Sequence, residues 1–300
     1  MKHIAVIGAG TMGNGIAHVF AQYGFEVNLV DIREDILQKA LQTIRQNADR
    51  QVKKQILTAQ QVEELMLRIH LFTRMPEALQ HAELVVEAAT EKQELKEELF
   101  RQIDQLAPES AILASNTSSI SITRLAAVTR RQPRVIGMHF MNPVPVMPLV
   151  EIINGFHTDS AITTTIVELS RQLGKTPCVV NDYPGFISNR ILMPMINEAI
   201  YALQQGVAGV EAIDTIMKLG MGHPMGPLQL ADFIGLDVCL SILQVLHEGL
   251  GEPKYAPCPL LVKMVQAGCL GVKSGAGFYR YKAGSKEKEV NPIFLTDRAF

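Results

Sequence analysis

Residues 2–15 have the sequence KHIAVIGAGTMGNG, and this stretch decides the fold class. The run from Lys2 to Ile7 is short, apolar and β-branched, which predicts a buried strand. A G-x-G-x-x-G turn follows, residues 14–23 carry apolar side chains at helical spacing, and a second apolar run over residues 27–30 ends in Asp31. This order of strand, glycine turn, helix, strand and acid predicts a dinucleotide-binding βαβ unit.

The residues of the turn have separate roles in such a unit. Gly8 permits the tight turn out of the strand, and Gly13 lets the following helix lie close to the sheet. Gly10 leaves room for a pyrophosphate, which the helix N-terminus around Thr11 and Met12 would bind with backbone N–H groups and its positive dipole end. The alternative is a glycine turn that only connects two elements.

Asp31 predicts the choice of dinucleotide. Its carboxylate can accept hydrogen bonds from a ribose 2′-OH and would repel a 2′-phosphate, so we expect NAD rather than NADP. FAD is a further alternative, although the polar residues described below suit hydride transfer better.

Composition bounds the class of protein. The chain has 300 residues, enough for two domains, with 47% hydrophobic and 19% charged residues, as in ordinary globular proteins. A net charge of −2 without a basic tract gives no indication of nucleic-acid binding, and no apolar run is long enough for a membrane span. The four cysteines form no C-x-x-C pair, which favours free thiols in a reducing compartment. Because the first strand begins close to Met1, we expect no signal peptide and a cytoplasmic location.

The remaining pattern predicts two domains, over residues 1–184 and 185–300. The first alternates strands and helices, which indicates an α/β, Rossmann-like fold with a mostly parallel sheet and a helical-hairpin insertion over residues 34–68. Its further strands are expected at residues 69–73, 84–88, 111–114, 134–138, 149–153 and 176–180. A helix over residues 91–107 is expected to turn four apolar side chains inward: Leu95, Leu99, Ile103 and Leu106.

The second domain is predicted to be all-helical, with no strand pattern before residues 277–279. Residues 186–203 are apolar on nearly all sides and contain Pro194, so we expect a kinked helix that is buried all round. Further helices are expected at residues 210–219, 227–248 and 259–267. So much apolar helix surface in roughly a hundred residues predicts a homodimer formed through this domain.

A buried acid indicates the reactive centre. Glu151 lies within the apolar run of residues 149–153, where an unpaired charge would be costly, so it needs a partner. His139 ends the preceding strand, and the turn over residues 142–145 can bring it beside Glu151. The carboxylate would fix the tautomer of the imidazole, which could then take a proton from a hydroxyl and return it.

Two further polar residues are candidates for the same site. Ser118 follows a predicted strand and could hold a substrate oxygen, while Asn189 is either a hydrogen-bonding residue at a domain cleft or a satisfied core amide. The alternative is a hydrolase triad of Ser118, His139 and Glu151, but no G-x-S-x-G elbow surrounds the serine. The sequence shows no metal-ligand spacing.

Charged residues near the predicted strand ends leave alternatives open. Glu91 and Lys96 could face the cofactor, or they could be ordinary charges in the first turn of a helix. Arg50, Lys53 and Lys54 put positive charge near the tip of the helical hairpin, which is either a solvated face or a clamp for a phosphorylated substrate.

With these residues in view, the chain resembles the L-3-hydroxyacyl-CoA dehydrogenases of the short-chain, bacterial 3-hydroxybutyryl-CoA dehydrogenase type. The motifs that carry the resemblance extend from residue 8 to residue 279: GAGTMG (8–13), VVEA (85–88), SNTSS (115–119), HFMNPVP (139–145), DYPGFISNR (182–190), GHPMGP (222–227) and GVKSGAGFY (271–279). Together they cover nearly the whole chain.

The resemblance implies a role for each matching position. It implies an NAD-binding domain, a helical dimerisation domain that closes over the substrate, and reversible oxidation of a 3-hydroxyacyl-CoA. His139 would be the general acid/base and Glu151 its partner, with Ser118 and Asn189 around the substrate. NAD contacts are assigned to Asp31, Glu91, Lys96, Asn142 and Lys273, and CoA contacts to Asn116 and to the Lys53–Lys54 region.

Two other classes of function remain open. One is a non-catalytic, crystallin-like NAD-binding protein, which the intact His139–Glu151 pair disfavours. The other is a dehydrogenase of a different substrate, either a sugar acid such as gulonate or 3-hydroxyadipyl-CoA. The acyl chain length and the direction of the reaction in the cell are left open.

Overall fold

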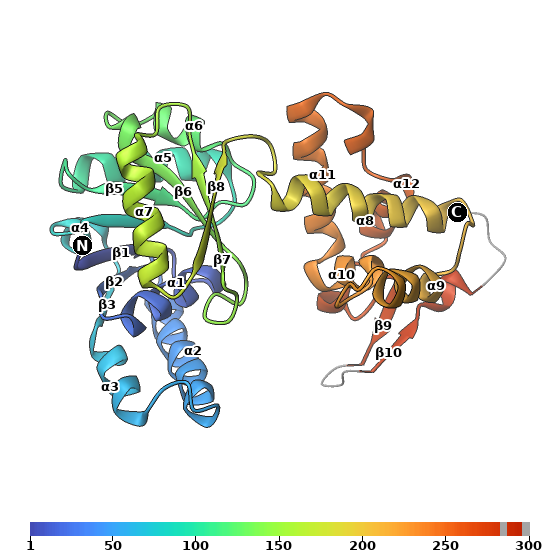
Figure 1. Ribbon diagram of the computed structural model, residues 1–300, viewed down its shortest axis with the longest axis horizontal. Helices are drawn as coiled ribbons and strands as arrows, with labels where there is room; N and C mark the ends of the chain where they lie inside the picture. The colour runs from blue at the N-terminus through green and yellow to red at the C-terminus, as the bar shows by residue number, and fades with distance from the viewer. Residues whose placement is uncertain (283–286, 296–300) are drawn as a thin grey trace. The chain divides into compact units, whose positions relative to one another are not determined.

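The computed structural model describes residues 1–282 and 287–295, and the chain divides into two compact units, Met1–Tyr183 and Pro184 onward. Unit 1 contains one sheet of eight strands in the order β3-β2-β1-β4-β5-β6-β7-β8, with helices on both faces (Figure 1). The strands are β1 (His3–Ile7), β2 (Glu26–Val30), β3 (Ile69–Phe72), β4 (Leu84–Glu87), β5 (Ile112–Ser115), β6 (Val135–Phe140), β7 (Leu149–Asn154) and β8 (Thr176–Asn181).

The sheet is mostly parallel, which confirms the predicted fold class. Neighbouring strands from β3 to β6 run parallel, whereas β7 is antiparallel to β6 and β8 is parallel to β7. The helices of this unit are α1 (Thr11–Gln22), α2 (Glu34–Lys53), α3 (Ala59–Leu67), α4 (Met75–Leu79), α5 (Gln93–Leu106), α6 (Ile122–Ala127) and α7 (Ser160–Gln172). The predicted hairpin is α2 and α3, which project together beyond one end of the sheet in Figure 1.

The glycine turn between β1 and α1 is held by close backbone packing. Gly8 has a φ of +97°, a conformation that favours glycine, and a Cβ on it would lie 2.7 Å from the carbonyl oxygen of Ala88. A Cβ on Gly13 would lie 1.7 Å from the carbonyl oxygen of Gly8. The turn therefore depends on these two glycines, and it lets α1 bury Ile16 and Phe20 against the sheet.

The buried face of α5 differs from the prediction. Leu95 is 41% exposed and Leu106 is also exposed, while Lys96 and Asp104 lie inside with Phe100 and Ile103. The prediction was wrong for these leucines because it assumed that charged side chains face water. Both charged groups have buried partners instead: Lys96 pairs with Glu87, and Asp104 pairs with Arg131.

Unit 2 is built on helices, as predicted, but it also contains strands. Its helices are α8 (Ser188–Gln204), α9 (Val210–Thr215), α10 (Pro227–Ile234), α11 (Leu236–Leu250) and α12 (Pro259–Gln266). The antiparallel pair β9 (Tyr279–Tyr281) and β10 (Lys288–Val290) corrects the expectation of an all-helical domain.

Two expectations for the helices of unit 2 were wrong. The single helix predicted over residues 227–248 is two helices, α10 and α11, which meet at a 97° bend at Gly235, where φ is +106°. The helix α8 is not buried all round, because Ile191 is 66% exposed, while Met193, Ile196 and Ile200 form its buried face.

A buried carboxylate holds β9 against the helices of unit 2. Asp232 on α10 accepts hydrogen bonds from the backbone N–H groups of Phe278 and Tyr279 and from the hydroxyl of Tyr281. A Cβ on Gly277 would lie 1.8 Å from this carboxylate, so the glycine is required by the contact. Burial raises the pKa of Asp232 to about 6 despite the hydrogen bonds that stabilise its charge.

Candidate active site

The histidine and the acid predicted from the sequence lie side by side. β6 and β7 are antiparallel neighbours, and His139 is directly opposite Glu151 in their register. The Nδ1 atom of His139 lies 2.8 Å from Oε2 of Glu151, and both side chains are buried. The expected partner for the buried acid is therefore confirmed as a contact.

The other ring nitrogen of His139 faces Ser118. Ser118 follows β5, and its Oγ lies 3.1 Å from Nε2 of His139. Because the ionised carboxylate of Glu151 only accepts hydrogen bonds, it selects the tautomer with the proton on Nδ1. The neutral ring then presents Nε2 as an acceptor, which can take the proton of a hydroxyl placed beside Ser118.

Glu91 fixes the loop that carries Ser118. Its Oε1 accepts hydrogen bonds from the backbone N–H groups of Ser118 and Ser119, at 2.9 and 3.2 Å, and from the hydroxyls of Thr117 and Ser119. Burial raises the pKa of Glu91, but the Lys96 ammonium and these hydrogen bonds outweigh burial and leave it below its usual value. Since the carboxylate occupies these two amides, they form no oxyanion hole, which argues against the hydrolase alternative.

Lys96 lies inside the unit rather than on its surface. It is 1% exposed, and its Nζ lies 2.6 Å from Oε1 of Glu87 and 3.3 Å from Oε2 of Glu91. Glu87 also accepts a hydrogen bond of 2.6 Å from the Ser115 hydroxyl at the end of β5. Lys96 therefore links the ends of β4 and β5 through two carboxylates.

Asn116 ties together two strand ends beside the histidine. Its Oδ1 accepts a hydrogen bond of 2.9 Å from the backbone N–H of Phe140, the residue after His139. The Asn116 side chain is buried. Its hydrogen bond to the backbone of Phe140 helps to hold the neighbouring His139 in place.

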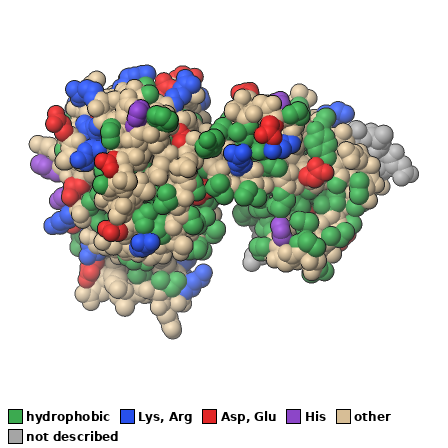
Figure 2. All heavy atoms as spheres, turned by 45° about the horizontal axis from the view of Figure 1, so that its top comes forward, with side chains coloured by type: hydrophobic (Ala, Val, Ile, Leu, Met, Phe, Trp, Pro, Cys, Tyr) green, Lys and Arg blue, Asp and Glu red, His purple; other side chains and the backbone are tan. Residues whose placement is uncertain are grey.

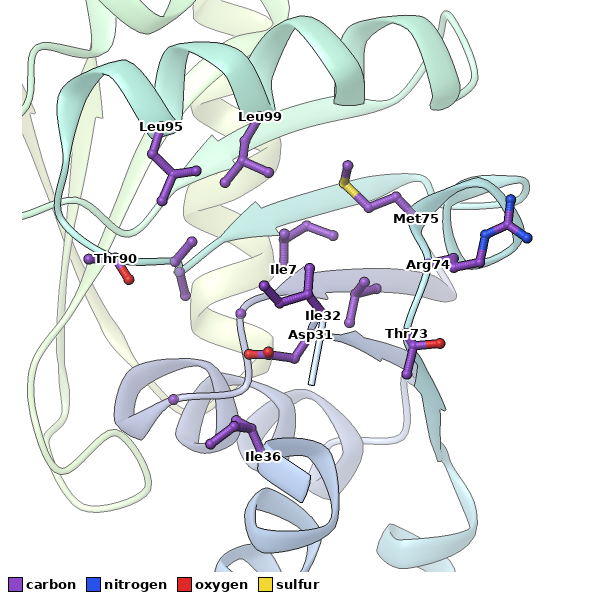
Figure 3. Close-up of a pocket in the computed structure, with 15 residues that line it drawn as sticks. Ile7, Asp31, Ile32, Ile36, Thr73, Arg74, Met75, Thr90, Leu95 and Leu99 are labelled. Carbon is purple, nitrogen blue, oxygen red and sulfur yellow. The ribbon is translucent and has the colours of Figure 1, made fainter. Parts of the chain in front are cut away.

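Asp31 lies at a cavity of 540 Å³ beside the glycine turn. Its Oδ2 accepts a hydrogen bond of 2.9 Å from the backbone N–H of Ala9, and its Oδ1 accepts one of 3.2 Å from the backbone N–H of Arg33. Figure 3 shows Leu95 and Leu99 on the α5 side of this cavity and Ile36 on the α2 side, with Asp31 between them. The lining of the cavity is thus mostly apolar and includes one acid, which fits an adenosine group.

A second cavity, of 300 Å³, lies on the other side of the glycine turn. Its lining includes Gly10, Thr11 and Asn142 together with the α2 residues Thr43 and Asn47. Gly10 lines both cavities, and a Cβ on it would meet no atom within 4 Å. The residues around the turn therefore fit a dinucleotide, with open space where its phosphates would approach the backbone.

The remaining predicted residues are found in three places. Lys53 and Lys54 are exposed at the C-terminal end of α2 and do not line either cavity. In unit 2, Asn189 is buried on α8, and Nζ of Lys273 lies 2.6 Å from Oδ2 of Asp237.

Several residues that line the two cavities were not predicted as site residues. Ile32, Leu95 and Leu99 line the larger cavity, and Thr43 and Asn47 line the smaller one. Apolar residues at helical spacing are usually core residues, and small polar residues on a helix are usually solvated, so neither group stands out. The signal available in the sequence was the position of Ile32, one residue after Asp31.

Over residues 1–282 and 287–295, no cluster of three or more His, Cys, Asp or Glu side chains could hold a metal ion. In the same part of the chain, no single helix has the length and apolar content to cross a membrane, although the bent pair α10 and α11 passes that test when taken together.

Two family models cover almost the whole chain. The model described as "3-hydroxyacyl-CoA dehydrogenase, NAD binding domain" matches residues 3–183. The model described as "3-hydroxyacyl-CoA dehydrogenase, C-terminal domain" matches residues 185–281.

Individual relatives are similar over nearly their full length. "Probable 3-hydroxybutyryl-CoA dehydrogenase" of Bacillus subtilis (strain 168) is 53% identical over 282 residues, which are 94% of this chain and 98% of the relative. "Hydroxyacyl-coenzyme A dehydrogenase, mitochondrial" of Homo sapiens is 44% identical over 288 residues, with 94% and 92% covered. The crystal structure of (S)-3-hydroxybutyryl-CoA dehydrogenase from Ralstonia eutropha has a TM-score of 0.92 and 49% identity, and 94% of this chain and 99% of that chain are covered.

Proposed function

Because the chain belongs to the 3-hydroxyacyl-CoA dehydrogenase family, we propose that it interconverts a short-chain L-3-hydroxyacyl-CoA and the matching 3-oxoacyl-CoA. It is an NAD-dependent oxidoreductase. The names of the relatives support 3-hydroxybutyryl-CoA as the substrate. The observation that carries the proposal is the contact chain from Glu151 through His139 to Ser118, at the same edge of the sheet as the glycine turn.

Each side chain of this contact chain has one task. His139 accepts the proton of the 3-hydroxyl at Nε2 in oxidation and returns it in reduction. Glu151 holds the ring in the required tautomer and stabilises the positive charge that the proton brings. The Ser118 hydroxyl holds the substrate oxygen beside Nε2. When bound, NAD supplies the hydride acceptor, and NADH supplies the donor in reverse.

The other residues are proposed in supporting roles. Glu91, Lys96 and Asn116 have contacts that support the positioning of Ser118 and His139, in addition to the cofactor or CoA contacts that the resemblance assigns to them. Asn142 lines the cavity at the glycine turn, which supports a cofactor contact. Roles for Asn189 and Lys273, and for Lys53 and Lys54 at the CoA phosphates, stay predictions.

A homodimer through unit 2 is part of the proposal. Figure 2 shows hydrophobic side chains over much of the visible face of this unit. The exposed large apolar residues of its helical part include Ile191, Ile216, Leu219, Met221 and Phe233. A patch of this kind supports a protein interface, since monomeric proteins rarely expose so many large apolar groups together. The cytoplasmic location expected from the sequence stays a prediction.

A substrate panel tests the proposed function. Acetoacetyl-CoA, 3-oxohexanoyl-CoA and longer 3-oxoacyl-CoA esters are each mixed with NADH, and the loss of NADH absorbance is followed. Free acetoacetate, gulonate with NAD and 3-hydroxyadipyl-CoA with NAD are the comparison substrates. We expect the highest kcat/KM with acetoacetyl-CoA. Turnover of gulonate alone, or of no substrate in the panel, would contradict the proposal.

The choice of NAD over NADP should depend on Asp31. In Asp31→Ser we expect the KM for NAD to rise by on the order of 10-fold or more, because hydrogen bonds to a charged group are worth about 1.5–3 kcal/mol. We also expect the use of NADP to improve. Asp35→Ser is the matched control, since Asp35 is an exposed acid nearby that pairs with Arg33. Steady-state kinetics with both cofactors measure the effect, and an unchanged NAD/NADP ratio in Asp31→Ser would remove Asp31 from cofactor selection.

The glycine turn allows folding and cofactor binding to be tested separately. Gly13→Ala should lower the melting temperature and abolish NAD binding, because its Cβ would collide with the carbonyl of Gly8. Gly10→Ala should melt within a few degrees of the wild type but lose NAD affinity, because its methyl group enters open space where the phosphates approach. Thermal melts and NAD titrations measure the two effects. Full NAD affinity in Gly10→Ala would place the phosphates elsewhere.

A further inference from the structure

Lys175 is a buried lysine outside the site described above. It lies between α7 and β8 and is 9% exposed. Its Nζ donates hydrogen bonds to the carbonyl oxygens of Val144 and Met147, at 2.5 and 2.8 Å. Within the part of the chain that the structure describes, it has no carboxylate partner, and burial lowers its pKa. A charge held in this way needs an explanation, because a buried ammonium is costly.

The two carbonyls belong to the connection between β6 and β7, residues 141–148, which we call the 141–148 turn. It joins the strand that carries His139 to the strand that carries Glu151. Its residues Asn142, Pro143, Val144 and Pro145 also line the smaller cavity beside the glycine turn. The position of this one turn therefore affects both the acid/base pair and a wall of the cofactor site.

Other contacts also hold the 141–148 turn: the backbone N–H groups of Val146 and Met147 both donate to the carbonyl of Pro143, at 2.9 Å. Val144 packs on α1, where a Cβ on Gly15 would lie 2.9 Å from its own Cβ. At the end of the turn, the backbone N–H of Thr176 donates to the carbonyl of Pro148. The ammonium of Lys175 bridges the carbonyls of Val144 and Met147, which those backbone hydrogen bonds do not use, and so adds the side-chain constraint on where the turn lies.

A buried histidine lies near Lys175. His18 on α1 is fully buried nearby, with its Nε2 3.0 Å from Oε1 of Gln51. Burial lowers the pKa of His18, hydrogen bonds with Gln51 and Gln22 raise it, and the charge of Lys175 lowers it further. Burial and the charge of Lys175 therefore both favour the neutral form of His18.

We propose that Lys175 is a positioning residue: its buried ammonium fixes the 141–148 turn and so holds His139 against Glu151 and the turn against the bound cofactor. An apolar residue at this place would leave two backbone carbonyls without a donor, and the turn would move to find one. The expected effect of Lys175 on turnover rests on the proposed function. The expected effect on NAD affinity does not.

The test compares three variants of the full-length protein. Lys175→Met keeps the length of the side chain but not its hydrogen bonds, and we expect the Kd for NAD to rise about 10-fold and kcat to fall by a similar factor. Lys175→Arg retains donors for both carbonyls and should recover most of the NAD affinity. Leu169→Ala on α7 removes buried apolar volume away from the turn and should lower the melting temperature without either functional change.

NAD titration, steady-state kinetics and thermal melting separate the outcomes. The proposal is overturned if Lys175→Met binds NAD as the wild type does. It is overturned as well if Leu169→Ala, at the same decrease in melting temperature, loses as much NAD affinity and kcat as Lys175→Met. It is also overturned if Lys175→Arg is no better than Lys175→Met. A wild-type protein that binds NAD but turns over no acyl-CoA contradicts the proposed function alone, since the NAD titration still tests Lys175.

Discussion

The variant His139→Gln should turn over acetoacetyl-CoA about 10²–10⁴-fold more slowly than the wild type, the range expected for losing a general acid/base. Gln is similar in size and can still form hydrogen bonds with Glu151 or Ser118, but it does not accept and return a proton near neutral pH. The melting temperature and NAD affinity should change little, because glutamine can keep hydrogen bonds with Glu151 and Ser118 in the same place.

The control for this variant is His157→Gln. His157 is exposed in the loop after β7 and belongs to neither cavity. Its replacement should leave kcat unchanged under the same NADH assay. Normal turnover in His139→Gln would refute the assignment of the acid/base group, whatever the control shows.

The second large effect is expected from Glu151→Gln. The amide is isosteric with the carboxylate, but it can present its NH₂ group to Nδ1 and so select the wrong tautomer, a change that costs on the order of 10⁴-fold in a serine-protease triad. We expect a fall in kcat on the order of 10²–10⁴-fold, with NAD affinity kept. The loss of charge should also move the limb of the pH–rate profile that reports the acid/base group to lower pH, since the amide stabilises the imidazolium less.

Glu168→Gln provides the comparison, because Glu168 is an exposed acid on α7 in the same unit. It corrects for the change in net charge. If the pH–rate profiles of Glu151→Gln and Glu168→Gln coincide with that of the wild type, the pair is only a structural contact.

The fold and the acid/base pair were predictable because their signals are local. The glycine turn requires backbone conformations and close contacts that glycine alone permits, and alternating apolar runs identify the strands that follow. Glu151 was informative for a different reason: a charge within an apolar strand needs a partner, and the topology offered His139.

The failures share a physical cause, since each depends on side-chain contacts or backbone conformation in the folded chain that the local residue pattern does not show. Lys96 is buried because two carboxylates from other elements surround it, which the pattern around residue 96 does not reveal. Gly235 breaks a helix through its positive φ, although a single glycine is often tolerated inside one. Lys175 binds backbone carbonyls. Every residue has a backbone carbonyl, so residue types in the sequence do not indicate this partner.

The antiparallel pairing of β6 and β7 also constrains how the gene can change. Successive side chains of a strand point to opposite faces, so inserting or deleting one codon between Leu149 and Glu151 would carry the acid to the other side of the sheet. Apolar residues along the strand can be exchanged for one another, but an insertion or deletion of odd length there would leave His139 without its carboxylate neighbour.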